Sequence, residues 1–200
     1  MTTPTETHGL GIGRLTEDID ELLRRFTEPH AIAGRVGEAL SRHLDQPGWL
    51  PPCFQEPDND RYRQHLIHVS PCRRFSIVSL VWKPGQCTPI HDHVSWCVVG
   101  VYSGLESSTG YQLFEGANGR FLVPTHSHTL HPGATDILVP PDEDIHQVTC
   151  AGDDLTVSIH IYGADIGKLG NSVNRRFDDV EIRSPDRLPS SSRPLRWRTN

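Results

Sequence analysis

The chain has 200 residues, of which 36% are hydrophobic, and a formal net charge of −6. This content suffices for one globular domain, and the negative charge argues against a nucleic-acid-binding protein, which favours a basic surface. The N-terminus lacks a cationic region followed by an apolar one, and no apolar run is long enough to span a bilayer. We therefore expect a cytoplasmic monomer or small homo-oligomer that acts on small molecules, with no nucleic-acid or membrane partner. The five cysteines show no CxxC spacing, so we expect reduced thiols.

The N-terminal part of the chain is predicted to be helical after a flexible start. Residues 1–13 are polar and rich in Gly and Thr, which is typical of a mobile terminus. Thr16 is a suitable N-cap, and apolar residues then recur at three- and four-residue spacing. A second apolar stripe follows Pro29. The pattern predicts a helical segment over about residues 16–45, packed on a larger body.

The middle of the chain alternates short β-rich segments with turn residues, and no clear helical period returns before Ile166. The candidate strands are Tyr62 to Val69, Phe75 to Trp82, Trp96 to Tyr102, Tyr111 to Phe114, Phe121 to Val123, Thr135 to Val139, Gln147 to Cys150 and Leu155 to Tyr162. Many short strands at this spacing indicate a β-sandwich or β-barrel, a natural holder for a metal and a small ligand.

The C-terminal tail, residues 183–200, is rich in proline, serine and arginine and has little apolar surface to bury. We expect it to be disordered, which leaves residues 14–182 as one domain. Two alternatives are a local lid and attachment to a neighbouring subunit through Leu195 and Trp197.

Two histidines lie one residue apart within the apolar, β-branched stretch 84–104. In an extended strand His91 and His93 point to the same face, because side chains alternate across a strand. Neutral imidazoles that converge in this way are suitable metal ligands. A third ligand must come from elsewhere in the chain.

The residues around this pair resemble the first sequence motif of the cupin superfamily. Gly85 is followed after five residues by His91-x-His93, and Gly104 completes the motif. Cys97 occupies the position where this motif usually has Glu.

The second cupin motif is partly matched by Pro141-x-Glu143-x-x-His146. Glu143 replaces the usual Gly, and Cys150 replaces the usual Asn. The resemblance implies a mainly β fold, a cupin-type β-barrel that is jelly-roll-like and spans about residues 61–165, with an N-terminal helical segment. It also implies that His146 is the third metal ligand beside His91 and His93.

The missing Glu ligand points to one group of cupins. Three neutral imidazoles leave a divalent iron with its full charge and with open coordination positions. A three-histidine site with Cys or Gly at the Glu position is similar to the thiol dioxygenases, the group of cysteine dioxygenase and 3-mercaptopropionate dioxygenase. The resemblance covers about residues 62–177 and implies an Fe(II) cofactor, O2 as co-substrate and a small thiol substrate. That thiol, such as cysteine or 3-mercaptopropionate, would bind as thiolate and be oxidised to a sulfinate.

Two further segments resemble this group. Ser158, His160 and Tyr162 match its Ser-x-His-x-Tyr strand, and alternation places them on one face, where they can form a catalytic hydrogen-bonded relay. Tyr62-x-Gln64 resembles the substrate-binding strand, in which cysteine dioxygenase has Arg and 3-mercaptopropionate dioxygenase has Gln. The resemblance therefore implies that Tyr62 and Gln64 position the substrate.

The departures from the group pattern concern Cys97 and the substrate carboxylate. Cys97 stands where animal cysteine dioxygenases have the cysteine that forms a thioether with the relay tyrosine, so a crosslink between Cys97 and Tyr162 is one hypothesis and a free buried cysteine the other. The arginine that reaches the carboxylate in the mercaptopropionate enzymes has no counterpart at Gly170 or Asn171. Arg175 or Arg176 replaces it only if residues 171–174 are an insertion.

Two alternative functions stay open at this point. One is a cupin oxygenase of specialised metabolism that acts on cysteine or a cysteine derivative and gives a different product. The other is a cupin that binds a metal or ligand without turnover. The remaining histidines are assigned no metal: the stretch 125–133 is read as a solvated loop, and His65 or His68 could face the pocket.

Overall fold

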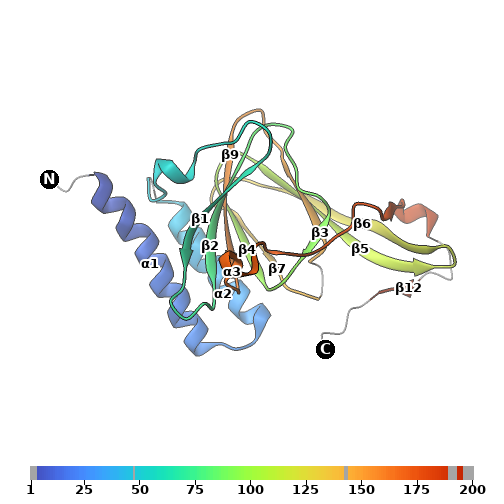
Figure 1. Ribbon diagram of the computed structural model, residues 1–200, viewed down its shortest axis with the longest axis horizontal. Helices are drawn as coiled ribbons and strands as arrows, with labels where there is room; N and C mark the ends of the chain where they lie inside the picture. Colours follow the sequence, from blue (N-terminus) through green and yellow to red (C-terminus); the bar gives the residue numbers. More distant parts are fainter. Residues whose placement is uncertain (1–3, 47, 142–143, 189–192, 196–200) are drawn as a thin grey trace.

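The computed structural model describes residues 4–46, 48–141, 144–188 and 193–195 (Figure 1). The helices are α1 (Pro4–Arg25), α2 (Pro29–Leu44), α3 (Ile166–Leu169) and the short 3₁₀ helices η1 (Pro52–Phe54) and η2 (Pro185–Arg187). The strands are β1 (Arg63–Val69), β2 (Ser76–Trp82), β3 (His91–His93), β4 (Cys97–Ser103), β5 (Glu106–Gly116), β6 (Gly119–Leu130), β7 (Thr135–Leu138), β8 (His146–Cys150), β9 (Thr156–Tyr162), β10 (Val173–Arg176), β11 (Glu181–Ile182) and β12 (Arg193–Pro194).

The strands form two sheets with jelly-roll connectivity. One sheet has the order β1-β2-β9-β4-β7, and the other contains β10-β3-β8-β5-β6-β11. From β2 to β9 the chain pairs β2 with β9, β3 with β8, β4 with β7 and β5 with β6, as a long antiparallel ribbon does when it wraps into a barrel. The mainly β, jelly-roll-like barrel with N-terminal helices that the sequence predicted is therefore confirmed.

The two N-terminal helices cover the outer face of the five-stranded sheet (Figure 1). Helix α2 places Leu40 and Leu44 against Gly100 of β4, where an added Cβ would lie 2.6 Å from Leu40 and 2.7 Å from Leu44. The glycine thus allows the helix to approach the sheet closely. A continuous apolar cluster joins both helices to this face.

The turns on either side of the histidine pair explain two glycines of the first motif. Gly85 has φ +81° and Gly104 has φ +78°, a region that other residues rarely adopt. A Cβ on Gly104 would also lie 2.4 Å from Thr156 Oγ1. These positions need glycine for backbone reasons, independently of any metal.

Helix α1 begins at Pro4, earlier in the chain than the helix start that the sequence predicted near Thr16. Gly11 lets the helix backbone pack closely on Trp49, whose Cβ would be 3.0 Å from an added Cβ. The Thr16 hydroxyl donates to the Gly13 carbonyl at 2.7 Å inside the helix, so Thr16 does not cap it. Gly11 therefore permits close packing of the helix on Trp49.

The described part of the C-terminal tail contains the 3₁₀ helix η2 and the strand β12, which pairs with β5. Strand β8 pairs only with the first half of β5. Further along β5, Arg193 and Pro194 of β12 pair with Glu115 and Phe114. The Leu195 N–H donates to Leu113 O at 2.9 Å, and the Leu195 side chain packs on the apolar cluster that contains Leu113. Leu195 therefore contacts its own chain, while Trp197 lies outside the described residues.

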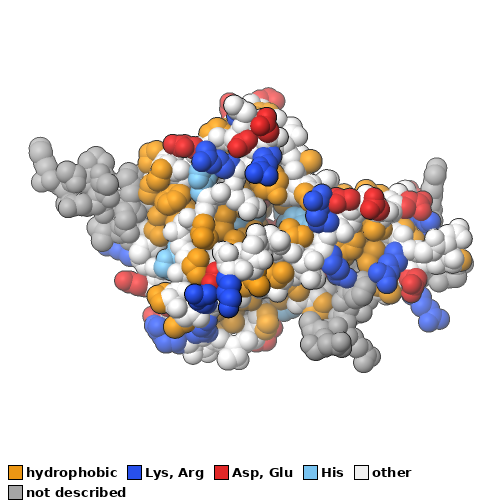
Figure 2. Space-filling view, viewed as in Figure 1, with side chains coloured by type: hydrophobic (Ala, Val, Ile, Leu, Met, Phe, Trp, Pro, Cys, Tyr) orange, Lys and Arg blue, Asp and Glu red, His pale blue; other side chains and the backbone are white. Residues whose placement is uncertain are grey.

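The face shown in Figure 2 is mixed in charge: acidic and basic side chains are interspersed over the barrel and the projecting β5–β6 hairpin. Among the described helices, none combines the length and the apolar character needed to cross a bilayer.

Candidate metal centre

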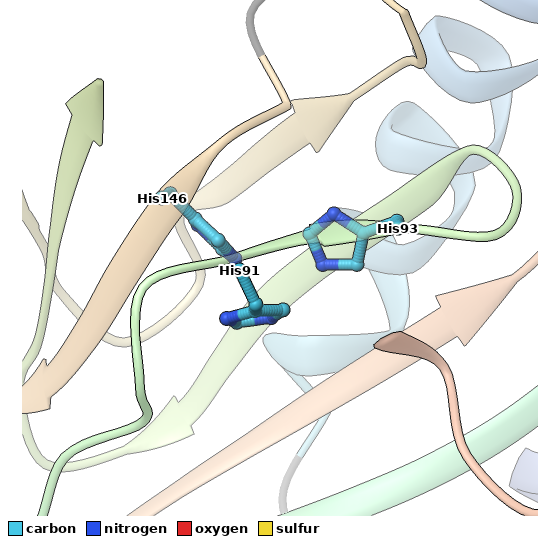
Figure 3. A group of neighbouring side chains, drawn as sticks. All are labelled: His91, His93 and His146. Atoms are coloured by element: carbon cyan, nitrogen blue, oxygen red, sulfur yellow. The ribbon is translucent and has the colours of Figure 1, made fainter. Parts of the chain in front are cut away.

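Three histidines converge inside the barrel (Figure 3). Their ring centroids form a nearly equilateral triangle, with separations of 4.8 Å, 4.8 Å and 4.9 Å. His91 and His93 come from β3, and antiparallel pairing of β3 with β8 places His146 directly opposite His91. One ligand atom from each residue lies within 4.8 Å of the others, so the set is suited to a metal ion.

Each ring is oriented by a contact of its Nδ1 atom, which leaves Nε2 as the natural ligand atom. The His91 Nδ1 lies 3.0 Å from Pro89 O, and the His146 Nδ1 lies 3.1 Å from Ser108 Oγ. Among the described residues the His93 Nδ1 has no hydrogen-bond partner, and it lies 3.9 Å from Asp144 Oδ2. Hydrogen bonds thus orient two of the three rings, and the third lies beside a buried carboxyl group.

Burial keeps these imidazoles in the form that binds metals. It lowers the pKa of His91, and it lowers the pKa values of His93 and His146 well below their usual range, with smaller effects from neighbouring imidazoles. A neutral imidazole offers a lone pair, whereas imidazolium does not. The donor set therefore fits a divalent cation.

Asp144 is a buried carboxyl beside this centre. Its Oδ2 accepts the backbone N–H of His93 at 3.0 Å. Burial raises the pKa of Asp144 to about 6, although the His93 N–H opposes this shift. A group so placed near a ligand ring is well suited to fix that ring's orientation.

The space in front of the three histidines is small. The cavity has a volume of about 20 Å³, and its walls include all three rings together with Tyr62, Gln64, His160, Tyr162 and Ser172. This volume is room for about one water molecule. A larger ligand therefore requires movement of side chains at the mouth.

A larger cavity of about 300 Å³ is also lined by His146. It is bordered by Ser108, His126 and Asp136, and it contacts only one of the three converging rings. Its greater size does not make it the metal centre, because metal binding depends on convergent donors.

The Ser158-His160-Tyr162 strand faces the metal centre as a hydrogen-bonded chain. Trp82 Nε1 donates to Ser158 Oγ at 3.1 Å, Ser158 Oγ lies 3.0 Å from His160 Nε2, and His160 Nδ1 lies 3.3 Å from Tyr162 Oη. All the members are buried. The Tyr162 ring centroid is 6.3 Å from that of His93, so the chain ends beside the metal ligands.

Cys97 lies beside Tyr162 because β4 pairs with β9 and the two residues are direct partners in register. Burial raises the pKa of both groups well above the usual range, and the Tyr162 phenol hydrogen-bonds the Cys97 thiol, which opposes the shift for Cys97. Cys97 is thus a protonated, buried thiol in contact with the relay tyrosine.

The predicted substrate-binding residues lie at the same cavity. The Tyr62 ring stacks on Trp82 with centroids 4.5 Å apart, and Gln64 lines the cavity from β1. His65 and His68 do not line it: His65 Nε2 lies 2.8 Å from Glu56 O, and the His68 ring packs against Phe75. The expectation that one of these two histidines could face the pocket is therefore wrong.

The two arginines after α3 have different roles. Gly170 ends α3 with φ +85°, and β10 then runs antiparallel to β3, with Arg175 opposite Asp92 and Arg176 opposite His91. Arg175 binds the buried Asp92 carboxylate, with Nε 2.6 Å from Oδ2. Arg176 is half exposed, pairs with Asp178 at 2.9 Å, and its charge acts on Tyr62 and His91.

Sequence reasoning missed the groups that orient the ligands. Ser108 and Asp144 lie on β5 and just before β8, and only pairing between strands brings them to His146 and His93. The signal for Asp144 was its position two residues before His146 in the second motif, whereas Ser108 gave none. Glu143 of that motif lies outside the described residues.

The histidines of stretch 125–133 are a further correction, since His126 and His128 lie in strand β6 rather than in a loop. Their rings stack at 5.7 Å, and His128 Nε2 contacts Asp136 Oδ2 at 3.0 Å. The turn residues that suggested a loop occur at its end, where Gly133 has φ +85°.

Comparison with known proteins adds a general likeness in fold. No protein-family model matches the chain. A double-stranded β-helix protein from Klebsiella pneumoniae is similar over 57% of this chain and 86% of its own, with TM-score 0.42 and 16% identity. A cupin superfamily protein from Desulfitobacterium hafniense is similar over 58% and 91%, with TM-score 0.43 and 13% identity. An oxalate decarboxylase structure matches over 56% and 28%, with TM-score 0.41 and 15% identity.

Proposed function

We propose that this protein is an Fe(II)-dependent thiol dioxygenase that adds both atoms of O2 to the sulfur of a small thiol. One observation carries the proposal: three buried, neutral imidazoles converge without a carboxylate ligand among the described residues, directly beside the Tyr162 chain. An all-imidazole site keeps the full charge of a divalent ion, which favours an anionic thiolate as the next ligand.

A bound Fe(II) would supply a Lewis acid that lowers the thiol pKa and an electron source for O2. The protein groups position the reactants. The phenol of Tyr162, held by His160 and Ser158, can hydrogen-bond a polar atom of the substrate or of O2. The barrel walls exclude bulk water, because the three rings are nearly completely buried.

The substrate tail is proposed to lie toward Tyr62 and Gln64. Arg176 is a cation near this mouth that could attract a carboxylate, since its charge already acts on Tyr62 and His91. It is a surface residue paired with Asp178, so a substrate carboxylate would compete with that aspartate. A thiol with a carboxylate, such as cysteine or 3-mercaptopropionate, suits this arrangement.

A thioether between Cys97 and Tyr162 is a second part of the proposal. The contact between thiol and phenol supports it. Forming the bond removes one hydrogen from the thiol and one from the ring, and O2 accepts both hydrogens with their two electrons to give hydrogen peroxide. Iron-loaded protein after aerobic turnover should lose the mass of two hydrogens, and its Cys97 should resist alkylation. Complete alkylation of Cys97 would contradict the crosslink.

The deciding experiment is a screen of thiols against the Fe(II) protein without oxygen, followed by admission of O2. We expect a spectral change with the correct thiol, oxygen uptake that depends on that thiol, and a sulfinate product that contains both atoms of labelled O2. Oxygen uptake with a different product would favour the specialised-metabolism oxygenase. Metal binding without thiol-dependent uptake across the screen would favour a binding protein.

A further inference from the structure

Glu106, at the start of β5, is a buried carboxyl group that the proposed chemistry does not yet use. Its side chain is 1% exposed, and its Oε2 atom has no hydrogen-bond partner among the described residues. Burying a carboxylate without a partner is unfavourable. Such a group in a native core calls for a specific explanation.

Glu106 lies close to His160, a member of the Tyr162 chain. Glu106 Oε2 lies 3.9 Å from His160 Nε2, and the His160 side chain is also buried. This distance is too long for a hydrogen bond, yet a charge at this separation in a buried site acts strongly on the ring. The same Nε2 atom lies 3.0 Å from Ser158 Oγ.

The hydrogen bonds of the chain can run in two directions. Trp82 Nε1 can only donate, so Ser158 Oγ accepts its hydrogen and retains one hydrogen of its own. In the first direction Ser158 donates to His160 Nε2, and His160 Nδ1–H donates to Tyr162. In the second direction His160 Nε2–H donates to Ser158, and Tyr162 donates to Nδ1.

We propose that Glu106 is a positioning residue that selects the second direction by holding His160 in the tautomer protonated at Nε2. A carboxylate beside Nε2 attracts a hydrogen on that atom and disfavours a lone pair there. Nδ1 is then the acceptor for the Tyr162 hydrogen. The phenol oxygen consequently turns its lone pairs, rather than its hydrogen, toward the metal centre.

With the hydrogen bonds in this direction, the Tyr162 oxygen can accept the proton of the substrate thiol. This consequence rests on the proposed thiol dioxygenase function. As the S–H bond breaks, the Tyr162 oxygen gains that proton and its own hydrogen passes to His160 Nδ1. No electron is transferred to the protein. His160 becomes an imidazolium, and the Glu106 carboxylate stabilises its positive charge.

The tautomer can be read without any turnover. Protein labelled with ¹⁵N-histidine and supplied with Zn²⁺ gives distinct long-range ¹H–¹⁵N patterns for the two tautomers, and His160→Gln identifies the His160 signals. We expect Nε2–H in the wild type and a change toward Nδ1–H in Glu106→Met, which removes the charge and keeps an unbranched side chain. The matched control is Glu115→Met, at an exposed position on the same strand, and it should leave the pattern unchanged. Nδ1–H in the wild type, or an unchanged pattern in Glu106→Met, would overturn the proposal.

If Glu106→Met does not fold, Glu106→Gln takes its place, because it keeps the shape and loses the charge. A wild-type pattern in that variant would likewise contradict the role of Glu106.

A double-mutant cycle then tests whether Glu106 acts through His160. Glu106→Met should lower kcat about tenfold in the wild type and less than about twofold in a His160→Gln background, since coupled residues are not additive. Equal losses in both backgrounds would indicate a general structural role and overturn the proposal. Absence of thiol-dependent oxygen uptake in the wild type would instead reject the proposed function, and the tautomer measurement would still decide the role of Glu106.

Discussion

The two faces of strand β9, in the middle of the five-stranded sheet, are equally buried but differ in chemistry. Val157, Ile159 and Ile161 face the helices and join their apolar cluster. Ser158, His160 and Tyr162 alternate with them, face the interior of the barrel and hydrogen-bond one another. All seven residues of the strand are buried, so burial alone does not separate the two faces.

The two faces of β9 should therefore tolerate different kinds of substitution. The outward-facing residues of β9 require only that apolar volumes fit, and volume-conserving exchanges there should cost little. The inner face requires that each buried polar atom find its partner, because an unsatisfied group in a low-dielectric interior is unfavourable. Substitutions on the outer face should therefore affect stability, and those on the inner face should affect chemistry.

His91→Ala should have the largest effect, because it removes one of the three ligand atoms. We expect the protein to lose bound iron and all thiol-dependent oxygen uptake. Metal analysis after iron loading and desalting measures this, with His131→Ala, an exposed histidine, as the control. Full iron occupancy in His91→Ala would refute the assignment of the centre.

Leu40→Ala tests the outer face, where Leu40 is fully buried against Gly100. We expect the free energy of unfolding to fall by about 3 kcal/mol, from lost burial and an unfilled cavity. Iron content and turnover per iron should stay at the wild-type level under conditions where the protein is folded. Urea unfolding measures the free energy of unfolding, with Glu38→Ala at an exposed position as the control. Loss of iron from folded Leu40→Ala would contradict the expectation that outer-face substitutions leave the metal centre intact.

Tyr162→Phe tests the inner face with a change of one atom. The variant should keep its iron, because Tyr162 is not a member of the three-histidine group, and should lose about a hundredfold in turnover. The neighbouring Ile161→Val on the outer face should turn over normally and lose about 1 kcal/mol of stability. Wild-type turnover in Tyr162→Phe would show that the phenol is dispensable.

Glu28→Gln should have the smallest effect, confined to the helical layer. Glu28 caps α2 by accepting the N–H groups of His30 and Ala31 at 3.0 Å and 2.7 Å, and these bonds lower its pKa below 4.5. The folded protein therefore binds that proton less tightly than the unfolded chain, so the stabilisation is present above about pH 4.5 and is lost as the pH falls further. Melting curves should show a lower Tm for Glu28→Gln near neutral pH and convergence with the wild type in acid. A constant difference at all pH values would contradict the role of the charge.

Much of the difference between the two faces of β9 could be predicted from the sequence. The features that could not be predicted depend on contacts between distant segments. The period of two in residues 156–162 and the His-x-His spacing predicted which side chains share a face. The helix start was predicted too late in the chain, since Gly11 packs on Trp49, a contact that local propensity does not reveal. Leu195 likewise contacts Leu113, far from it in sequence. Composition describes a segment alone and does not describe the surface on which it packs.

The sequence by itself determined the mainly β fold, the histidine pair and the polar face of β9, because alternation within a strand is a local property. Only the tertiary structure decided that Asp144 meets His93 across 51 residues, that Ser108 orients His146, and that Glu106 lies beside His160. The physical reason is that strand pairing sets these contacts. A strand's own sequence fixes which of its residues share a face, but its neighbours in the folded barrel decide what that face meets.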